Sequence, residues 1–378
     1  MIKYVGVNDK ITELFEGQFI VPNGISYNSY LLLEDKTCLF DTVDIRFYNE
    51  FLENVKNALN GKKLDYLVIN HMEPDHSASI DKLLNLYPEV TVVSTQKSFQ
   101  MINQFFPGLK IKNQLVVKDG DSLNLGNKNI TFVTAPMVHW PEVMFSYLVE
   151  DKILFSADAF GKFGSLDYDD PEGWACEARR YYFGIVGKYG QQVQAVLKKL
   201  ANFNIEAIYP LHGPVLDSNL SYYLNLYDIW SKYEPENEDA TTIVYSSVYG
   251  NTREAALYLA SKLKKDYDLF DLVNDDMAEA VEGAFENKRL VICTITYNGE
   301  VFPQTLKFLN ALTERNYQNR KIAIIENGSW APNAKAYIYK HFEKSKNIEF
   351  YPNVVSIKSK MSDENIKQID ELAKELED

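Results

Sequence analysis

The spacing of apolar and polar residues changes near residue 240. Before that point, short apolar or alternating runs recur between turn pairs such as Asp119-Gly120 and Gly126-Asn127. Such runs predict strands, here at residues 18–21, 30–34, 38–41, 64–69, 90–94, 115–117, 121–125, 130–134, 152–156 and 205–209. Apolar residues at helical spacing predict helices at residues 47–59 and 80–87. Short strands with interleaved helices favour an α/β domain built as an αββα sandwich.

After residue 240, strands and helices alternate strictly. Strands are expected at residues 242–246, 268–273, 289–295, 321–326 and 348–356, and helices at 252–265, 276–286, 303–316, 333–345 and 362–376. Such alternation predicts a doubly wound parallel sheet of strand order 2-1-3-4-5. The acidic, proline-containing segment 232–240 lacks apolar periodicity and is interpreted as a linker. The expected domains are therefore residues 1–238 and 241–378.

Candidate chemistry is concentrated directly after the predicted strand 64–69. His71, Glu73, Asp75 and His76 form the pattern H-x-E-x-D-H, at the kind of strand end where α/β folds place their functional groups. Alternation puts the first three on one side of an extended backbone, and Pro74 disfavours a helix. Imidazoles and carboxylates in this number are typical ligands of iron, manganese or zinc. The chain has only five histidines, so a metal site explains this segment better than a solvated polar loop.

Three further residues follow the ends of other predicted strands: His139, Asp158 and His212. Taken singly, each is explained as well by an ordinary core or surface position. Residues at separate strand ends can converge on one rim of a sheet, so together they indicate one site. The fifth histidine, His341, lies in a helical pattern beside Lys340 and Lys344 and is interpreted as a surface residue.

The pattern resembles the H-x-H-x-D-H signature of the metallo-β-lactamase superfamily, with Glu73 in place of the second histidine. A carboxylate at that position shifts the preference from zinc toward iron or manganese, and H-x-E-x-D-H is the signature of the flavodiiron proteins. The resemblance implies two iron ions per chain, held by His71, Glu73 and His139, by Asp75, His76 and His212, and by Asp158 between them. Four neutral imidazoles and three carboxylates would carry a charge of −3, which largely offsets the charge of two Fe²⁺ ions. A bridging carboxylate would hold the two ions about 3.5–4 Å apart.

Residues 168–189 are rich in tyrosine and also contain Trp174 and Arg179-Arg180. The resemblance implies that this segment covers the metal pocket, with one tyrosine near the irons. The sequence does not identify that tyrosine, and a helix with packed aromatic side chains explains any single one equally well.

The first strand after residue 240 leads into a loop with hydroxyl side chains and one glycine. Neither a nucleoside-triphosphate loop nor a G-x-G-x-x-G dinucleotide motif is present in the sequence. Hydroxyl groups and backbone N–H groups at a helix start suit a monophosphate, although such a loop can also be a simple helix cap. With the loops after the third and fourth strands, it resembles the FMN site of flavodoxins. The residues implied to bind FMN are Ser247, Val248, Tyr249, Gly250, Asn251, Thr252, Thr296, Tyr297, Asn298, Gly299, Ser329 and Trp330.

The composition of the chain limits the kinds of partner and the cellular compartment that we expect. The net charge of −14 argues against nucleic acid and anionic membranes as partners. There is no signal peptide pattern and no apolar run near the ~20 residues that span a bilayer. The three cysteines lack a C-x-x-C pair, which excludes a rubredoxin within this sequence and fits a reducing cytoplasm. We therefore expect a cytoplasmic protein.

The resemblance covers both domains and implies a class A flavodiiron protein without fused redox modules. A carrier such as rubredoxin, or a reduced deazaflavin, would deliver electrons through FMN to the irons, which reduce O₂ to water or NO to N₂O. We expect O₂ to be preferred, because FMN and two irons together store four electrons, although the seven ligands do not distinguish the gases. The resemblance also implies a homodimer, or a dimer of dimers.

Two other functions are compatible with parts of this pattern. One is a zinc hydrolase of the metallo-β-lactamase type with an appended flavodoxin-like module, which Glu73 disfavours. The other is an electron-carrying flavoprotein with a vestigial metal domain, which the complete set of seven ligands disfavours. Iron, zinc and flavin content would separate all three.

Overall fold

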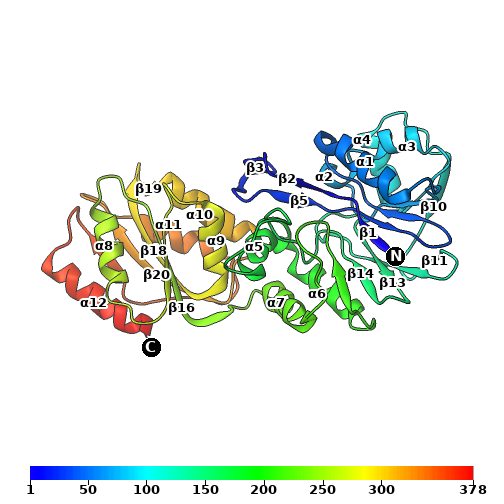
Figure 1. Ribbon diagram of the computed structural model, residues 1–378. Coiled ribbons are helices and arrows are strands. Elements are labelled where there is room, and N and C mark those ends of the chain that lie inside the picture. Colours follow the sequence, from blue (N-terminus) through cyan, green and yellow to red (C-terminus); the bar gives the residue numbers. More distant parts are fainter. Residues whose placement is uncertain (378) are drawn as a thin grey trace. The chain divides into compact units, whose positions relative to one another are not determined.

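The structure is a computed structural model that describes residues 1–377 (Figure 1). The chain folds as two compact units, Met1–Asp228 and Ile229 onward. Helix α7 (Leu220–Lys232) contains the division between them. The acidic segment predicted as a linker is not wholly free, because strand β16 (Asn237–Tyr245) begins within it. Asn237 pairs with Asn287, and Arg289 donates to the Glu238 carbonyl, so backbone pairing orders this polar stretch although its side chains lack periodicity.

The core of the first unit lies between two packed sheets, and two short two-stranded sheets accompany them. One of the packed sheets has the order β1 (Ile2–Tyr4), β6 (Tyr30–Leu32), β7 (Cys38–Phe40), β8 (Tyr66–Val68), β9 (Thr91–Ser94) and β10 (Asn113–Val116). The other has the order β11 (Ser122–Asn124), β12 (Asn129–Thr134), β13 (Met144–Leu148), β14 (Ile153–Phe155) and β15 (Ala207–Tyr209). Their inner faces share one apolar core. Phe40 of one sheet stacks on Phe155 of the other with ring centroids 3.8 Å apart, which confirms the predicted sandwich.

Helices cover the outer faces of this sandwich. Figure 1 shows α1 (Tyr48–Leu59), α3 (Ile80–Leu86) and α4 (Gln96–Phe105) over the first sheet, and α6 (Gly190–Leu200) beside the second. Neither β13 nor α4 is predicted by the sequence pattern. All five residues of β13 are buried, so the strand shows no alternation, and α4 is mostly polar but is capped by the Thr95 side chain.

One local expectation at the metal motif is wrong. Asp75 and His76 do not continue an extended backbone but lie in the one-turn helix α2 (Pro74–Ser77), which Pro74 opens. Proline is favoured at the first helical position, because its missing N–H has no helical partner there and its φ is already helical. Glu73 is still extended, with φ −61° and ψ 141°. The turn therefore directs Asp75 and His76 differently from His71 and Glu73.

The second unit is a parallel sheet of order β17 (Tyr267–Asp271), β16, β18 (Asn287–Tyr297), β20 (Arg320–Asn327) and β21 (Ile348–Phe350). This confirms the predicted order 2-1-3-4-5. The predicted strand 348–356 is split, because β22 (Val355–Ile357) pairs separately with β20. Pro352 lies in the interruption and has no N–H to donate to a ladder.

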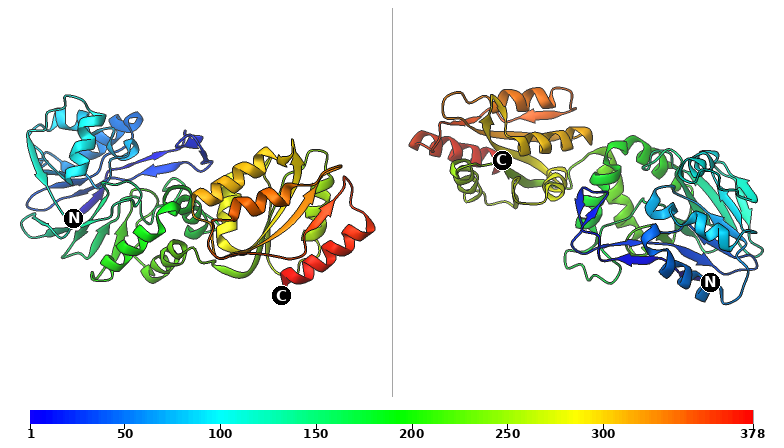
Figure 2. Two further views of the ribbon diagram at one scale, coloured as in Figure 1. Left: turned by 180° about the vertical axis from the view of Figure 1, so that it is seen from behind. Right: turned by 90° about the horizontal axis from the view of Figure 1, so that it is seen from above.

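Helices lie on both faces of this sheet (Figure 2). The helices α8 (Asn251–Ala260) and α12 (Asp363–Glu377) bury Leu259 and Leu372 against Ile243, Val291 and Ile325. The other helices are α9 (Met277–Glu286), α10 (Pro303–Glu314) and α11 (Ala334–Phe342). The loops that leave β16, β18 and β20 lie at the carboxyl edge of the sheet, where doubly wound folds bind ligands. Within residues 1–377, no helix combines the length and the apolar character that crossing a membrane requires.

Candidate metal centre and ligand pocket

The first unit brings together all seven residues predicted as metal ligands. They form two groups in which potential ligand atoms lie within 4.8 Å of one another: His71, Glu73, His139 and Asp158 in one, and Asp75, His76 and His212 in the other. Each residue lies beyond the end of a strand: β8 for the H-x-E-x-D-H segment, and β12, β14 and β15 for His139, Asp158 and His212. The two sheets therefore supply ligands to one edge of the sandwich.

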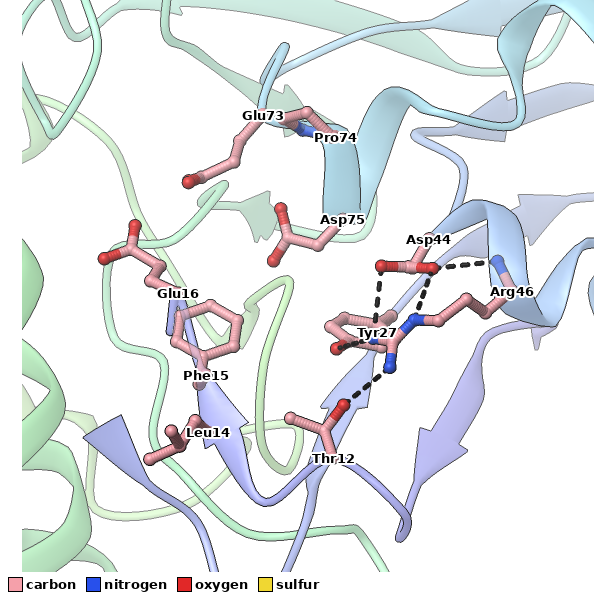
Figure 3. A pocket seen from close by; sticks show the side chains of 10 residues that line it. All are labelled: Thr12, Leu14, Phe15, Glu16, Tyr27, Asp44, Arg46, Glu73, Pro74 and Asp75. Carbon is pink, nitrogen blue, oxygen red and sulfur yellow. Dashed lines mark hydrogen bonds and ion pairs between the residues drawn. The ribbon is translucent and has the colours of Figure 1, made fainter. Parts of the chain in front are cut away.

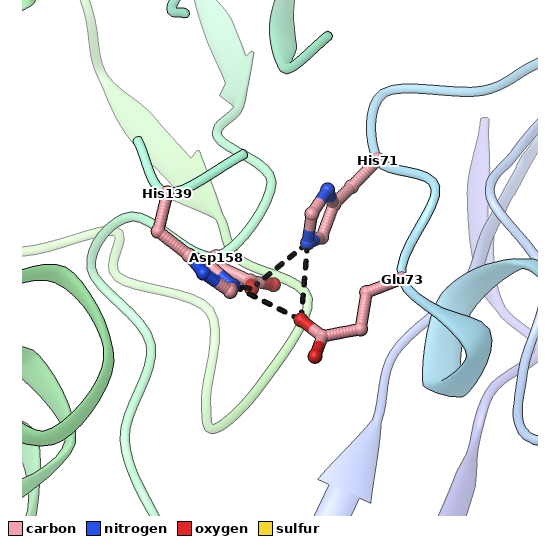
Figure 4. Close-up of side chains that lie close together, drawn as sticks. All are labelled: His71, Glu73, His139 and Asp158. Atoms are coloured by element: carbon pink, nitrogen blue, oxygen red, sulfur yellow. Dashed lines mark hydrogen bonds and ion pairs between the residues drawn. The ribbon is translucent and has the colours of Figure 1, made fainter. Parts of the chain in front are cut away.

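The first group converges on its carboxylates (Figure 4). The Nε2 atom of His139 lies 2.9 Å from Oε2 of Glu73 and 3.0 Å from Oδ2 of Asp158. Nε2 of His71 lies 3.3 Å from the same Glu73 oxygen and 3.4 Å from the same Asp158 oxygen. Two nitrogens and two oxygens thus surround one small space.

The second group meets the other oxygen of Asp158. Nε2 of His76 lies 3.0 Å from Nε2 of His212 and 3.2 Å from Oδ1 of Asp158. Oδ2 of Asp75 lies 3.2 Å and 3.3 Å from these two imidazole nitrogens. Asp158 therefore presents one carboxylate oxygen to each group.

Hydrogen bonds on the far side of two rings fix which nitrogen faces the centre. Nδ1 of His71 lies 2.9 Å from Oε1 of Glu142, which also accepts the N–H of Met72 at 2.9 Å. Nδ1 of His212 donates to the carbonyl of Ser26 at 2.7 Å. When Nδ1 carries the proton, the Nε2 lone pair is free for a metal.

A second buried carboxylate holds the backbone of the ligand loop. Asp41 accepts the N–H of Asn70 at 2.7 Å, the N–H of His71 at 3.1 Å and the Asn70 side chain at 2.8 Å. Burial raises the pKa of Asp41 to about 6, although these hydrogen bonds oppose the rise. Asp41 and Glu142 were not predicted from sequence, since neither lies in a pattern that marks a support for a distant loop.

The charges of the seven residues favour a bound cation. Burial alone lowers the pKa of a histidine, but the Asp75 and Asp158 carboxylates raise the pKa of His76 to about 10. The same carboxylate of Asp158, with Glu73, raises the pKa of His139 to about 9 against burial. Burial would raise the pKa of Glu73, yet His139 and His71 lower it to about 2. The carboxylates that stabilise protons on these histidines would stabilise metal ions at the same place in the same way.

Orphaned polar atoms show that the residues fit a metal pair. Among residues 1–377, both carboxylate oxygens of Asp75 and Oδ1 of Asp158 are buried without a hydrogen bond. Buried carboxylates are paired or coordinate metals, because an uncompensated charge is strongly disfavoured there. Carboxylate oxygens mixed with imidazoles suit iron or manganese better than an all-histidine site would.

Aromatic rings and a solvent-open cavity border the centre. The ring centroid of His212 lies 5.6 Å from Phe15 and 5.3 Å from Tyr181. Tyr181 is therefore the tyrosine of segment 168–189 that contacts this histidine ring. A cavity of about 300 Å³ lies beside Glu73 and Asp75, and Glu16 also lines it (Figure 3). Glu16 was not predicted from the sequence and lies in the hairpin between β3 (Leu14–Phe15) and β4 (Phe19–Ile20).

The second unit has a cavity of about 720 Å³ at the carboxyl edge of its sheet. Eleven of the twelve residues predicted to bind FMN line this cavity: Ser247, Val248, Tyr249, Asn251, Thr252, Thr296, Tyr297, Asn298, Gly299, Ser329 and Trp330. Gly250 does not line it; with φ 92° it precedes α8 and donates its N–H to the Ser247 hydroxyl at 3.1 Å. Ser359 also lines the cavity and was not predicted from the sequence; its hydroxyl lies 2.8 Å from that of Ser329.

The chemistry of this second cavity fits a flat aromatic ligand with an anionic group. Tyr249 and Trp330 are 93% and 91% exposed, so two large rings at its border lack protein neighbours that would bury them. Stacking on an aromatic ligand would cover them. Asn251 and Thr252 open α8, and backbone N–H groups at a helix N-terminus favour an anion such as phosphate. FMN has both features.

Each of the two units matches a family of known proteins. Residues 25–213 match the family model described as ODP family beta lactamase, and residues 242–375 match Flavodoxin domain. The chain is 31% identical to the anaerobic nitric oxide reductase flavorubredoxin of Escherichia coli O1:K1 / APEC, covering 88% of this chain and 72% of that one.

Solved structures match over nearly the full length. The flavodiiron protein from Giardia intestinalis has a TM-score of 0.92 at 24% identity and covers 99% of this chain and 95% of its own. A flavoprotein from Thermotoga maritima has a TM-score of 0.87 at 26% identity and covers 99% and 96%. With both domain matches in order and a relative above 30% identity, the chain belongs to the flavodiiron protein family.

Proposed function

We propose that this protein takes electrons from a carrier protein through FMN and delivers them to two iron ions that reduce O₂ to water, NO to N₂O, or both. The observation that carries the proposal is the position of Asp158, whose two oxygens face two separate groups of nitrogen and oxygen ligands. A zinc hydrolase remains the alternative class, and Glu73 in the first group weighs against it.

The proposed ligands divide as the two groups do. His71, Glu73 and His139 would hold one iron, Asp75, His76 and His212 would hold the other, and Asp158 would offer one oxygen to each. When both groups are bound, FMN supplies one-electron transfer, and the iron pair supplies a place where two metals can hold one small gas molecule. Reducing one O₂ to two waters takes four electrons and four protons, whereas two NO molecules give N₂O and one water with two of each.

The protein's own residues contribute orientation and exclusion of water. Glu142 and Ser26 hold the rings of His71 and His212 with Nε2 toward the centre. Phe15 and Tyr181 add aromatic surface beside His212, which limits the space around a bound gas. In the second unit, we assign Ser247 and Thr252 to the FMN phosphate, and Tyr249 and Trp330 to the flavin ring.

We further propose a separate electron donor of the rubredoxin type. The family resemblance supports such a donor, and the three cysteines of this sequence, of which Cys38 and Cys293 are buried, are fewer than the four thiolates that hold a rubredoxin iron. A reduced deazaflavin is the alternative donor. Three cysteines far apart in the sequence also fit a reducing compartment, and we propose the cytoplasm.

We also propose a homodimer in which the FMN of one subunit serves the irons of the other. The family resemblance supports this arrangement, and a dimer of dimers would preserve it. Mixing a subunit unable to bind FMN with one unable to bind iron should then restore part of the activity. Full turnover by a monomer in dilute solution would rule the arrangement out.

The proposed function is tested by metal and flavin analysis of protein purified without oxygen. We expect iron in excess of zinc, with about two irons and one FMN per chain. Zinc with hydrolase activity would support the alternative. The steady-state kcat/KM for O₂ and for NO with the same reduced donor then decides between the gases, where a tenfold difference corresponds to about 1.4 kcal/mol of transition-state preference.

A further inference from the structure

The cavity beside the proposed iron ligands has an acidic lining that the gas-reducing function does not use. Besides Glu73 and Asp75, it is lined by the carboxylates of Glu16 and Asp44 and by one cation, Arg46. The Arg46 guanidinium is already paired, because it lies 3.0 Å from Asp44 and 2.9 Å from Asp9. The lining next to the metal residues is therefore rich in carboxyl groups, and no cation in it is left unpaired among the described residues.

Glu16 is held where the cavity meets solvent. It is an exposed residue in the turn of the β3–β4 hairpin, with φ 47°. The side chain of Gln18 donates to Oε2 of Glu16 at 3.1 Å, which steadies the carboxylate. Figure 3 shows the carboxylates of Glu16, Glu73 and Asp75 turned toward one space.

The interior end of this space has a buried carboxylate, Asp75, whose ion-pair partners among the described residues are the imidazole nitrogens of the second ligand group. Asp75 is only 8% exposed, and among residues 1–377 neither of its carboxylate oxygens accepts a hydrogen bond. A path lined by carboxylates thus leads from the exposed Glu16 to this buried carboxylate. Hard oxygen donors in this number suit a divalent cation such as Fe²⁺.

We propose that Glu16, together with Glu73 and Asp75, forms a capture site at the mouth of the centre that takes Fe²⁺ from solution and passes it to the buried ligands. This inference rests on the proposed iron function. The transfer is a ligand exchange: carboxylate oxygens replace water on the ion, then imidazole nitrogens bind, and iron remains ferrous throughout.

The test follows iron uptake by the metal-free full-length protein, using Fe²⁺ under anaerobic conditions and low ionic strength. The Glu16→Gln variant removes the charge and keeps the side-chain shape. The Glu16→Gly variant removes the side chain at a position whose positive φ suits glycine, so loss of folding is not the expected explanation. The matched control is Glu13→Gln, which removes the same charge at an exposed position next to the same hairpin and outside the cavity.

Both Glu16 variants should take up Fe²⁺ about three- to tenfold more slowly than the wild type, since local charge raises the encounter rate of a cation. The iron bound at saturation should not change, and Glu13→Gln should match the wild type. Equal uptake rates in the Glu16 variants, or equal slowing in the Glu13 control, would overturn the inference. Lower iron at saturation would also overturn it, because Glu16 would then be a permanent ligand. A wild-type protein that binds no iron would instead contradict the proposed function.

Discussion

Oδ1 of Asp158 lies 3.2 Å from Nε2 of His76, while Oδ2 of Asp158 lies 3.0 Å from Nε2 of His139 in the other ligand group. No other residue of the seven reaches both groups in this way within the described chain. A carboxylate in this position can hold two metal ions together and share its charge between them. The variants of Asp158 should therefore act on both irons at once.

We expect Asp158→Ala to lower bound iron by about half or more and to abolish most gas reduction. FMN binding should persist, because the flavin loops belong to the other unit. Iron by elemental analysis and FMN by absorbance, measured on the same sample, check both parts. Retention of two irons with wild-type turnover would remove Asp158 from the bridging role.

Glu142 provides a second test, directed at the orientation of one ring. Glu142→Ala leaves the Nδ1–H of His71 and the N–H of Met72 without their buried acceptor, at a cost of about 1–3 kcal/mol for each unsatisfied donor. Glu142→Gln keeps an acceptor oxygen and removes only the charge. Iron retention should therefore fall in the order wild type, Glu142→Gln, Glu142→Ala. An alanine variant that retains iron as well as the glutamine variant would show that this hydrogen bond does not position His71.

The phosphate assignment predicts a loss of flavin affinity without loss of iron. Ser247→Ala combined with Thr252→Ala removes two hydroxyls from the cavity of the second unit. Hydrogen bonds to a charged group contribute about 1.5–3 kcal/mol each, so FMN affinity should fall by roughly a hundredfold or more. Fluorescence titration of the flavin-free protein measures the change. Unaltered affinity would move the phosphate to another part of the cavity.

Sequence and structure agree best where chemistry lies at strand ends. All seven proposed ligands were found because histidines and carboxylates followed predicted strands, and such loops converge in α/β folds. The supporting residues could not be found this way. Glu142 is 71 residues from His71, and Ser26 is 186 residues from His212. No local pattern links residues so far apart.

The prediction of local secondary structure was wrong where one residue type has opposite effects at different positions of a helix. Pro74 was expected to prevent a helix, yet it opens α2, because proline is unfavourable inside a helix and favourable at its start. Similarly, residues 237–240 are too polar to predict as a strand, but backbone pairing to β18 places Asn237 in β16. Glu16 gave no signal, since a lone acid in a turn is ordinary until the fold brings it near Glu73 and Asp75.

A buried carboxylate away from the metal ligands predicts a pH effect on stability. Oδ1 of Asp9 accepts two backbone N–H groups, from Ile11 and Thr12, and Oδ2 accepts from Tyr27 and Arg46. Burial alone would raise the pKa of Asp9, but the Thr12 and Ile11 hydrogen bonds and the Arg46 charge lower it. The ionised form is thus favoured by folding. Its stabilisation is present above the unfolded pKa of about 3.9 and is lost as pH falls through the lower folded value.

The matching variant is Asp9→Asn, which preserves shape and removes the charge. At pH 7 it should be less stable than the wild type by roughly 1–3 kcal/mol. The difference should shrink as the pH falls below about 4, where the wild-type carboxylate also becomes protonated. Thermal unfolding of both proteins across this pH range measures the difference. A constant difference at every pH would mean that the charge of Asp9 contributes nothing.

The hydroxyl of Tyr181 is buried without a hydrogen-bond partner among residues 1–377. Burial and the Asp158 charge hold the pKa of Tyr181 well above its usual value, so the phenol keeps its proton as a donor. An unsatisfied buried donor destabilises a protein by about 1–3 kcal/mol. Tyr181→Phe should therefore raise the Tm by a few degrees, about 2–4 °C per kcal/mol in a unit of this size. If the hydroxyl donates to the bound gas or its reduction product, the same variant should lower kcat/KM by about tenfold or more.

Tyr227→Phe is the matched control with the opposite expected effect on stability. The Tyr227 hydroxyl accepts the N–H of Phe160 at 2.5 Å, so removing it should lower the Tm by leaving that N–H unsatisfied. The pair separates function from packing, because loss of packing lowers stability and activity together. A more stable and less active Tyr181→Phe variant would identify Tyr181 as the donor above the irons. A less stable variant with unchanged kcat/KM would give Tyr181 a purely structural role.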